Sequence, residues 1–240
     1  MNPECIVILA DEPSGAGNLN SLLPILGERK TEHLNRAMLF DTLSVCLSLP
    51  LTDISVYYHP ASSRKKFKMD FDLFVHEEDD RLAKSKVNNI TLLPQNTASM
   101  PERSSMALSE SFRSGYERVI VIGTNCLTLN KTIIKAGFLL LRKNHVVIGP
   151  SFNGKYYLLG MSRHIPQAFK GIDWGSQDVY VRLRSNLKNP KIKVQELELS
   201  YMVNTIDELN QLIGDIECWR KVGENRTAFH TEKFLRTLNR

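Results

Sequence analysis

Short apolar runs rich in β-branched residues alternate along this chain with longer stretches of helical periodicity. The runs that predict strands are 5–10 (CIVILA), 53–59 (DISVYYH), 89–95 (NITLLPQ), 118–123 (RVIVIG), 145–150 (HVVIGP), 155–161 (KYYLLGM) and 193–199 (KVQELEL). Strands that alternate with helices form a mainly parallel sheet, because each parallel connection needs a crossover. We therefore expect a three-layer, Rossmann-like α/β fold, with helices on both faces of a mixed, mainly parallel sheet. The two runs that abut around 151–154 indicate one antiparallel pair in it.

Residue type and periodicity define the expected helices. Apolar residues at helical spacing from 31 to about 47 predict a helix packed on the sheet, and a second pattern covers about 131–142. Four helix starts are expected from capping chemistry: the capping-box pairs Ser99 with Glu102 and Thr205 with Glu208, the cap Asn130, and Ser176. The region 61–85 has short runs and dense charge, so no element is assigned to it.

Composition is typical of a folded globular protein, with 42% hydrophobic and 24% charged residues among 240. Without an internal repeat or linker, we expect one domain over 1–240, with 215–240 as a helical extension packed on it. The four cysteines have no metal or disulfide spacing, which indicates reduced thiols and a cytoplasmic protein. No segment has the length of a signal peptide core or a membrane span, so no membrane partner is expected.

The formal net charge of +5 suits an anionic partner such as a nucleotide phosphate, although a mild basic excess is also common without that meaning. Basic residues gather in 64–68 (RKKFK) and 182–193 (RLRSNLKNPKIK). The first run is soon followed by the acidic 77–80 (EEDD), and its single Phe67 is not the repeated interleaving of aromatic residues that stacks bases. Nucleic acid is therefore not an expected partner, while a nucleotide or a protein partner remains open.

One buried strand ends in the sequence GTNC, at Gly123 to Cys126. In α/β proteins, ligands and metals are held where such strands end, usually with an acid in reach. Gly123 allows a close approach of the backbone, but Asn125 offers an amide in place of the acid. The motifs of P-loop proteins, dinucleotide-binding proteins, α/β-hydrolases and zinc proteases are missing, and the six histidines are isolated in sequence.

Several segments at strand ends together resemble a known family. They are 10–18 (ADEPSGAGN), 123–129 (GTNCLTL), 149–161 (GPSFNGKYYLLGM), 172–179 (IDWGSQDV) and 202–209 (MVNTIDEL). The last four are similar, in order, to G-S-D-C-P, G-P-x-x-D-G-G-Y-Y-L-I-G-L, I-x-W-[GS]-[ST] and D-x-D-T-x-x-D-L. These patterns belong to the bacterial selenodomain- or arsenosugar-associated glycosyltransferases, small GT-A-fold relatives of the nucleotide-diphospho-sugar transferases. LLPILG and FDTL, between 22 and 43, match the first loop and helix of that family.

The resemblance implies a GT-A fold and a nucleotide-sugar donor whose diphosphate is neutralised by Mg²⁺ or Mn²⁺ held on carboxylates. Asn125, Asn153 and Asn204 stand where the family pattern has Asp. Hard cations need anionic oxygen ligands, and an amide has lost the charge and added a donor. We therefore expect binding of Mg²⁺ or Mn²⁺ to be weak or absent, and no cofactor is assigned.

The first loop departs from the family as well. Ala10, Leu19 and Ser21 stand where the family places Lys, Lys and Arg to hold phosphates, in an ungapped alignment. Gly15 and Gly17 can still offer backbone N–H groups to an anion, although a glycine-rich loop after a strand is more often a simple turn.

Lys155 replaces the second glycine of the family's G-G-Y-Y and is the one change that adds positive charge. Our hypothesis is that its ammonium partly replaces the metal; the alternative, that it points to solvent, carries more weight. Tyr156 or its neighbour is expected to reach the ligand cleft. Trp174 is a candidate for stacking on a sugar or base, or else a core anchor. Asp178, beside a helix start, fits a charge that complements the helix dipole.

Two functions are compatible with these features. The first is a nucleotide-diphospho-sugar transferase-like protein, a glycosyltransferase or nucleotidyltransferase that works with little or no metal. The second is a non-catalytic nucleotide-sugar-binding or protein-interaction module with the same fold. The candidate nucleotide- or sugar-binding residues are Ala10, Gly15, Gly17, Gly123, Asn125, Asn153, Gly154, Lys155, Tyr156 and Trp174. No catalytic residue is assigned.

Overall fold

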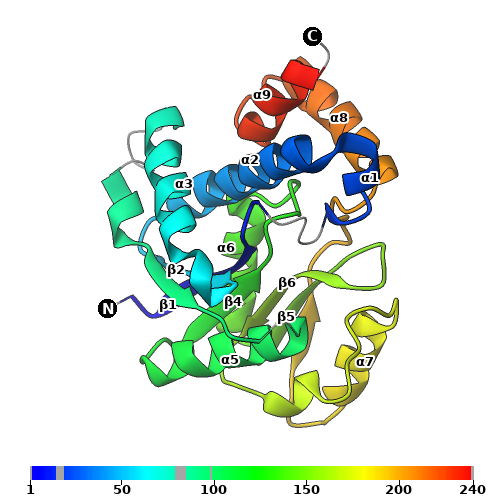
Figure 1. Ribbon diagram of the computed structural model, residues 1–240. Coiled ribbons are helices and arrows are strands. Elements are labelled where there is room, and N and C mark those ends of the chain that lie inside the picture. Colours follow the sequence, from blue (N-terminus) through cyan, green and yellow to red (C-terminus); the bar gives the residue numbers. More distant parts are fainter. Residues whose placement is uncertain (1, 15–18, 79–84, 98, 239–240) are drawn as a thin grey trace.

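The computed structural model describes residues 2–14, 19–78, 85–97 and 99–238 (Figure 1). In the described residues seven strands form one sheet, in the order β3-β2-β1-β4-β6-β5-β7. The strands are β1 (Glu4–Asp11), β2 (Asp53–His59), β3 (Thr91–Pro94), β4 (Arg118–Ile122), β5 (Val146–Pro150), β6 (Tyr156–Met161) and β7 (Val194–Glu196). β6 runs antiparallel to β4 and β5, and the other pairings are parallel. The expected mixed, mainly parallel sheet is confirmed, including the antiparallel pair around 151–154.

Helices cover both faces of the sheet (Figure 1). Their bounds are α1 (Leu23–Leu26), α2 (Glu28–Leu47), α3 (Arg64–Glu77), α5 (Met100–Arg113), α6 (Lys131–Leu141), α7 (Val179–Asn186), α8 (Ile206–Lys221) and α9 (Phe229–Leu238). Ile6 and Ile8 of β1 pack with α2, α3 and α6, while Val7 and Leu9 face α5 and α7 on the opposite side. Alternate side chains of a strand point to opposite faces, so a strand with two covered faces is apolar throughout.

The chain reverses its direction of sheet growth between β1 and β4. The chain first adds β2 and β3 on one side of β1 and then places β4 on the other side. In open α/β sheets this reversal leaves a crevice at the carboxyl ends of the two strands. The fold therefore predicts a ligand site beside the residues that follow β1 and β4.

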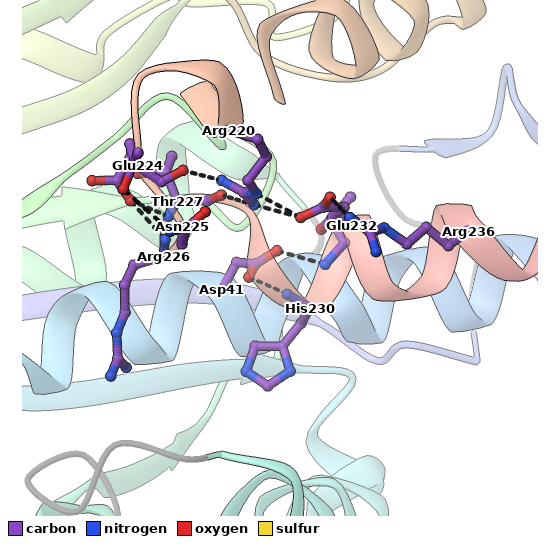
Figure 2. A network of polar contacts seen from close by, with 11 residues as sticks. Asp41, Arg220, Glu224, Asn225, Arg226, Thr227, His230, Glu232 and Arg236 are labelled. Atoms are coloured by element: carbon purple, nitrogen blue, oxygen red, sulfur yellow. Dashed lines mark hydrogen bonds and ion pairs between the residues drawn. The ribbon is translucent and has the colours of Figure 1, made fainter. Parts of the chain in front are cut away.

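The C-terminal helix α9 packs along α2, and a buried carboxylate joins the two helices. The Oδ1 and Oδ2 atoms of Asp41 accept hydrogen bonds of 2.8 and 2.9 Å from the backbone N–H groups of His230 and Thr231 (Figure 2). These N–H groups lie in the first turn of α9, where an intrahelical partner is missing. Asp41 thus acts as an N-cap supplied by another helix, beside the Arg220–Glu232 ion pair that joins α8 to α9.

Several expected boundaries are corrected by the structure. The unassigned region 61–85 contains α3, which buries Phe67, Phe71 and Phe74, and its residues 79–84 lie outside the described part. Ser99 does precede α5, but its capping box does not form. The helix expected from Ser176 begins at Val179. The C-terminal stretch is divided between the end of α8 and the separate helix α9.

Asn130 caps α6 as expected, and Thr205 with Glu208 forms the capping box of α8. Within the described ranges, no helix has the length and apolar character needed to cross a bilayer.

Candidate functional site

A small pocket that opens to solvent, with a cavity volume of about 40 Å³, lies at the carboxyl ends of β1 and β4. It occupies the crevice expected from the strand order. β1 supplies Leu9, β4 and its following loop supply 121–123 and Asn125, and the hairpin between β5 and β6 supplies 155–157. Helix α5, the loop before α7 and the segment before α8 complete the wall with Met100, Ser104, Trp174, Met202 and Asn204.

Two amide side chains meet across this pocket. Asn125 donates from Nδ2 to Oδ1 of Asn204 over 2.8 Å, and Asn204 donates from its own Nδ2 to the carbonyl of Met202 over 3.1 Å. Asn125 is only 6% exposed. A buried amide needs hydrogen-bond partners, and these two residues satisfy part of each other's need. In the family that this sequence resembles, both positions hold Asp. This chain therefore has a neutral amide pair in place of two negative charges.

The backbone beside the amide pair is fixed by further hydrogen bonds. The N–H of Val203 donates to the carbonyl of Asn125 over 2.8 Å. Oε2 of Glu208 accepts from the N–H groups of Asn204 and Thr205 over 2.7 and 2.9 Å, as part of the α8 capping box. The Val203–Asn125 bond limits how far the loop after β4 and the segment before α8 can move apart, and the two Glu208 bonds fix that segment to the start of α8. The pocket therefore has a rigid wall on the Asn125 side.

The opposite wall carries a lysine beside two aromatic rings. The Lys155 ammonium lies 5.3 Å from the centroid of the Trp174 ring, and the ring of Tyr156 meets the indole edge to face at 5.2 Å. Burial lowers the pKa of Lys155, and the nearby carboxylates of Asp173 and Glu208 oppose that shift. A half-buried ammonium on an aromatic face is a site for an anionic group, since an anion would offset the cost of burying the charge.

The structure brings five of the ten candidate residues to the pocket: Gly123, Asn125, Lys155, Tyr156 and Trp174. Asn204, named with the missing metal ligands, also lines it. At Gly123 a Cβ atom would lie 3.2 Å from Oδ1 of Asn125, so glycine here gives the amide its room.

The other candidates lie elsewhere. Ala10 is 1% exposed in the core under the sheet, and its carbonyl accepts from the buried Arg103. Asn153 accepts from the N–H of Lys155 in the hairpin turn and does not line the pocket. Gly154 has φ of +75° and packs against Gln177. Gly15 and Gly17 fall outside the described residues.

Met202, Met100 and Ser104 line the pocket but were not identified from the sequence. A signal existed for Met202, because it aligns with the first Asp of the family pattern D-x-D-T-x-x-D-L. Its thioether is another neutral group in the place of an acid. Met100 and Ser104 come from the start of α5, and nothing in the local sequence connects them with β1 or β4.

The family that the sequence resembles uses Mg²⁺ or Mn²⁺, and the residues present in this pocket do not fit such an ion. In the part of the chain that the structure describes, no three His, Cys, Asp or Glu side chains are grouped to hold a metal. The described lining residues contain no carboxylate, and Nδ2 of Asn125 places an N–H donor between the two amide oxygens. Hard divalent cations are bound by oxygen ligands, usually with carboxylates among them.

A family model described as "Uncharacterized protein conserved in bacteria (DUF2064)" matches residues 42–176. No curated protein matches the sequence. Among solved structures, a candidate nucleotide-diphospho-sugar transferase from Desulfovibrio desulfuricans G20 is similar with a TM-score of 0.79 and 24% identity, over 100% of this chain and 96% of that one.

Two further structures share the fold at lower identity. A cytidylyltransferase from Leptospira borgpetersenii serovar Hardjo-bovis (strain JB197) has a TM-score of 0.58 and 10% identity, over 100% of this chain and 96% of its own. A 4-diphosphocytidyl-2C-methyl-D-erythritol synthase from Anaerococcus prevotii DSM 20548 has a TM-score of 0.57 and 13% identity, over 90% and 97%. These likenesses show the GT-A-like fold of nucleotide-sugar transferases.

Proposed function

The chain belongs to the DUF2064 family, whose description names no activity, and from its pocket we propose that it binds a nucleotide-linked sugar as a glycosyltransferase-like protein. The observation that carries this proposal is the grouping of Lys155, Trp174 and the amide pair in one pocket at the carboxyl ends of β1 and β4. The fold relatives described as cytidylyltransferases and a candidate nucleotide-diphospho-sugar transferase support a nucleotide as the ligand. Fold likeness alone assigns no activity, so the pocket chemistry has to support it.

In this proposal the rings of Trp174 and Tyr156 bind the sugar or the base, and the ammonium of Lys155 binds the phosphate. Trp174 and Tyr156 offer apolar ring surface, while Lys155 supplies a positive charge close to it. During transfer, an acceptor hydroxyl oxygen forms a bond to the sugar carbon, and the bond between that carbon and the phosphate oxygen breaks. The electron pair of the broken bond leaves with the phosphate, and the proton of the acceptor hydroxyl passes to the departing phosphate. Lys155 would stabilise that developing charge, which is the role of a preorganised cation. The same proposal includes two further points: the pocket has lost the carboxylates of a metal site, and the chain belongs to the selenodomain- or arsenosugar-associated glycosyltransferases.

A second function is favoured by the lack of a proton acceptor. An attacking hydroxyl has to lose a proton, and the described lining residues include no carboxylate and no imidazole. Glu208 is close enough to influence the charge of Lys155, but its Oε2 already accepts two backbone N–H groups. A module that binds a nucleotide-sugar or a protein partner without turnover would need no base. This observation keeps the non-catalytic module as the alternative.

A thermal-shift panel tests whether the pocket binds nucleotides at all. The purified protein is heated with uridine, guanosine, cytidine, adenosine and thymidine nucleotides and their common sugar conjugates, in EDTA. A ligand bound only by the folded state raises the melting temperature, so one base series should stabilise the protein. If no nucleotide shifts the melting temperature, the nucleotide function is wrong and the protein-interaction module takes its place.

Turnover separates the two functions once a ligand is known. The stabilising sugar conjugate is incubated with the protein, and free nucleotide is measured over hours. Release above the rate without protein supports a transferase. A protein that binds the conjugate and releases nothing, with sugar or phosphosugar acceptors present, is the non-catalytic module.

The domain organisation is also a proposal. We propose one domain over 1–240, because α8 and α9 contribute to a core cluster that also contains Leu34 and Met38 of α2. Limited proteolysis tests it: cleavage between 222 and 228 that releases a stable fragment 1–221 would show that the C-terminal helix is a separate unit.

A further inference from the structure

We propose that the Asn125–Asn204 amide pair takes the place of a divalent cation in joining the loop after β4 to the segment before α8. The ligand then carries a single phosphate, which Lys155 binds. The inference rests on the proposed function, since it concerns the same pocket and a nucleotide ligand. It assigns this chain to metal-independent binding and names the ligand class as sugar-linked nucleoside monophosphates. Both parts follow from how charge and hydrogen bonds are arranged among the described residues.

The first step concerns what joins the two loops. Asn125 and Asn204 are 79 positions apart in sequence, yet Nδ2 of one donates to Oδ1 of the other over 2.8 Å. The N–H of Val203 reinforces the link by donating to the carbonyl of Asn125. In a pair of carboxylates at this distance, like charges would repel, and a cation would be needed to hold them together. A neutral donor and acceptor hold the same loops with no ion.

The second step concerns what a cation would meet. To bind Mg²⁺ or Mn²⁺ here, the Asn125 amide would have to rotate its donor away and break the bond to Asn204. The Asn204 amide would in turn lose its bond to the carbonyl of Met202. The ion would gain two neutral oxygens and no negative charge, which is a poor exchange for a strongly hydrated cation. The hydrogen-bonded pair is therefore the stable state with or without divalent ions in solution.

The third step concerns charge balance. Lys155 is the one ionised side chain among the described residues that line the pocket, and the carboxylates of Asp173 and Glu208 lie near it outside that lining. These acids disfavour a second negative charge on the ligand. A sugar ester of a nucleoside monophosphate carries one negative charge, and that of a diphosphate carries two. In a half-buried site an unmatched charge is costly, so one ammonium suits one phosphate. Among the described lining residues, no carboxylate could hold the metal that would offset a second phosphate.

The ligand test is isothermal titration of the methyl esters of CMP and CDP, UMP and UDP, and GMP and GDP, because these esters carry one and two negative charges as the sugar esters do, whereas a free terminal phosphate carries one more. Each is titrated in EDTA and in 1 to 5 mM Mn²⁺, a range on the order of a weak divalent site. For the base that binds, we expect the monophosphate to bind at least as tightly as the diphosphate in EDTA, and Mn²⁺ to change its affinity less than twofold. A diphosphate that binds ten times more tightly, or only with Mn²⁺, overturns the inference and leaves the proposed function intact. No binding by any nucleotide overturns the proposed function.

The amide link is tested apart from any nucleotide. We expect the melting temperature of the wild-type protein to be the same in Mn²⁺ and in EDTA. The double variant Asn125→Asp, Asn204→Asp should melt at a lower temperature at pH 8 and recover part of the loss in Mn²⁺. Asn153→Asp is the control for the single variant Asn125→Asp, because each adds one negative charge, but Asn153 lies outside the pocket and the variant should not respond to Mn²⁺.

If the double variant does not fold, the single variant Asn125→Asp gives the same comparison. A wild-type protein that Mn²⁺ stabilises, or acid variants that Mn²⁺ leaves unchanged, would show that the amide pair does not occupy the place of a cation.

Discussion

The ammonium of Lys155 lies over the ring of Trp174, 5.3 Å from the ring centroid. The two residues come from different elements, since Lys155 precedes β6 and Trp174 belongs to the loop before α7. Tyr156 meets the same indole edge to face. An aromatic face attracts a cation through its quadrupole, more strongly where water is partly excluded. Trp174 therefore positions the charge that the proposed ligand needs.

Replacing Trp174 with leucine tests this positioning role. Trp174→Leu keeps an apolar side chain but removes the ring face, so the pKa of Lys155 should fall further. Nucleotide affinity should fall by roughly threefold to tenfold, the equivalent of about 1 kcal/mol for a cation–π contact. Titration calorimetry and the pH titration of the Lys155 side chain by NMR measure the two effects. Trp219→Leu, in the other tryptophan of the chain, is the control and should leave both unchanged.

Lys155 itself is expected to set the pH dependence of binding. Burial lowers its pKa, so the ammonium loses its proton at lower pH than an ordinary lysine. A bound phosphate favours the charged form, hence affinity should be constant on the acid side of that pKa and fall as the pH rises through it. Lys155→Met should lose at least about tenfold in affinity, as expected for a charge-assisted contact, and lose the alkaline decline.

Lys135→Met, on the exposed side of α6, is the matched control for the loss of one positive charge. If Lys155→Met and Lys135→Met bind the nucleotide equally well, the assignment of Lys155 to the phosphate is wrong.

Local sequence chemistry predicted the elements better than it predicted the site. Asn130 and the Thr205–Glu208 box could be read from neighbouring residues, because a cap acts within one turn of its helix. Ser99 with Glu102 had the same spacing, but Glu102 accepts from Thr97 instead. Helix α3 was missed under its dense charge, although Phe67, Phe71 and Phe74 have helical spacing.

The site depends on contacts that no local pattern contains. Asn125 and Asn204 were identified separately, as departures from family motifs, and their mutual hydrogen bond required the folded chain. Asn153 was grouped with them by the same comparison, yet it closes a hairpin turn away from the pocket. A family motif identifies the sequence positions where related proteins have an acid. Which of those side chains lie in contact is determined by the fold.

The buried carboxylate of Asp41 predicts a pH effect on stability. Burial raises the pKa of Asp41 to about 6, although the N–H groups of His230 and Thr231 and the charge of His230 act in the opposite direction. A raised pKa in the folded state means that the folded protein holds the proton more tightly. Its contribution to stability is complete at low pH and is lost as the pH rises from about 4 to about 6, by roughly 2 kcal/mol.

Urea unfolding of the wild-type protein and of Asp41→Asn at several pH values between 4 and 7 measures this effect. The variant loses one acceptor for α9 at every pH but no longer titrates, so the two stability curves should converge as the pH rises. His230, Glu78 and Arg226 lie at the same helix start in both proteins, and the charge of His230 acts on Asp41, so the difference between the curves measures Asp41 together with its interaction with His230. Parallel curves would mean that Asp41 stays ionised in the folded state across this range.

Gly154 is expected to hold the hairpin that presents Lys155. Its φ is +75°, and a Cβ atom there would lie 1.9 Å from the backbone carbonyl oxygen of Gln177. Gly154 also accepts a hydrogen bond of 2.8 Å from the N–H of Tyr180. Since backbone cannot yield as a flexible side chain does, Gly154→Ala should push the hairpin away from α7 and carry Lys155 away from Trp174.

The matched control is Gly171→Ala, at a φ of +65° with no atom within 4 Å of the added Cβ. That change should cost roughly 1 kcal/mol of unfolding free energy, from the positive φ alone. Gly154→Ala should cost at least about 2 kcal/mol more, as overpacking does, and should also weaken nucleotide binding. Chemical denaturation and titration calorimetry of the two variants measure these effects. Equal losses of stability in both would show that the hairpin does not depend on its contact with Gln177, and the placement of Lys155 would then need another support.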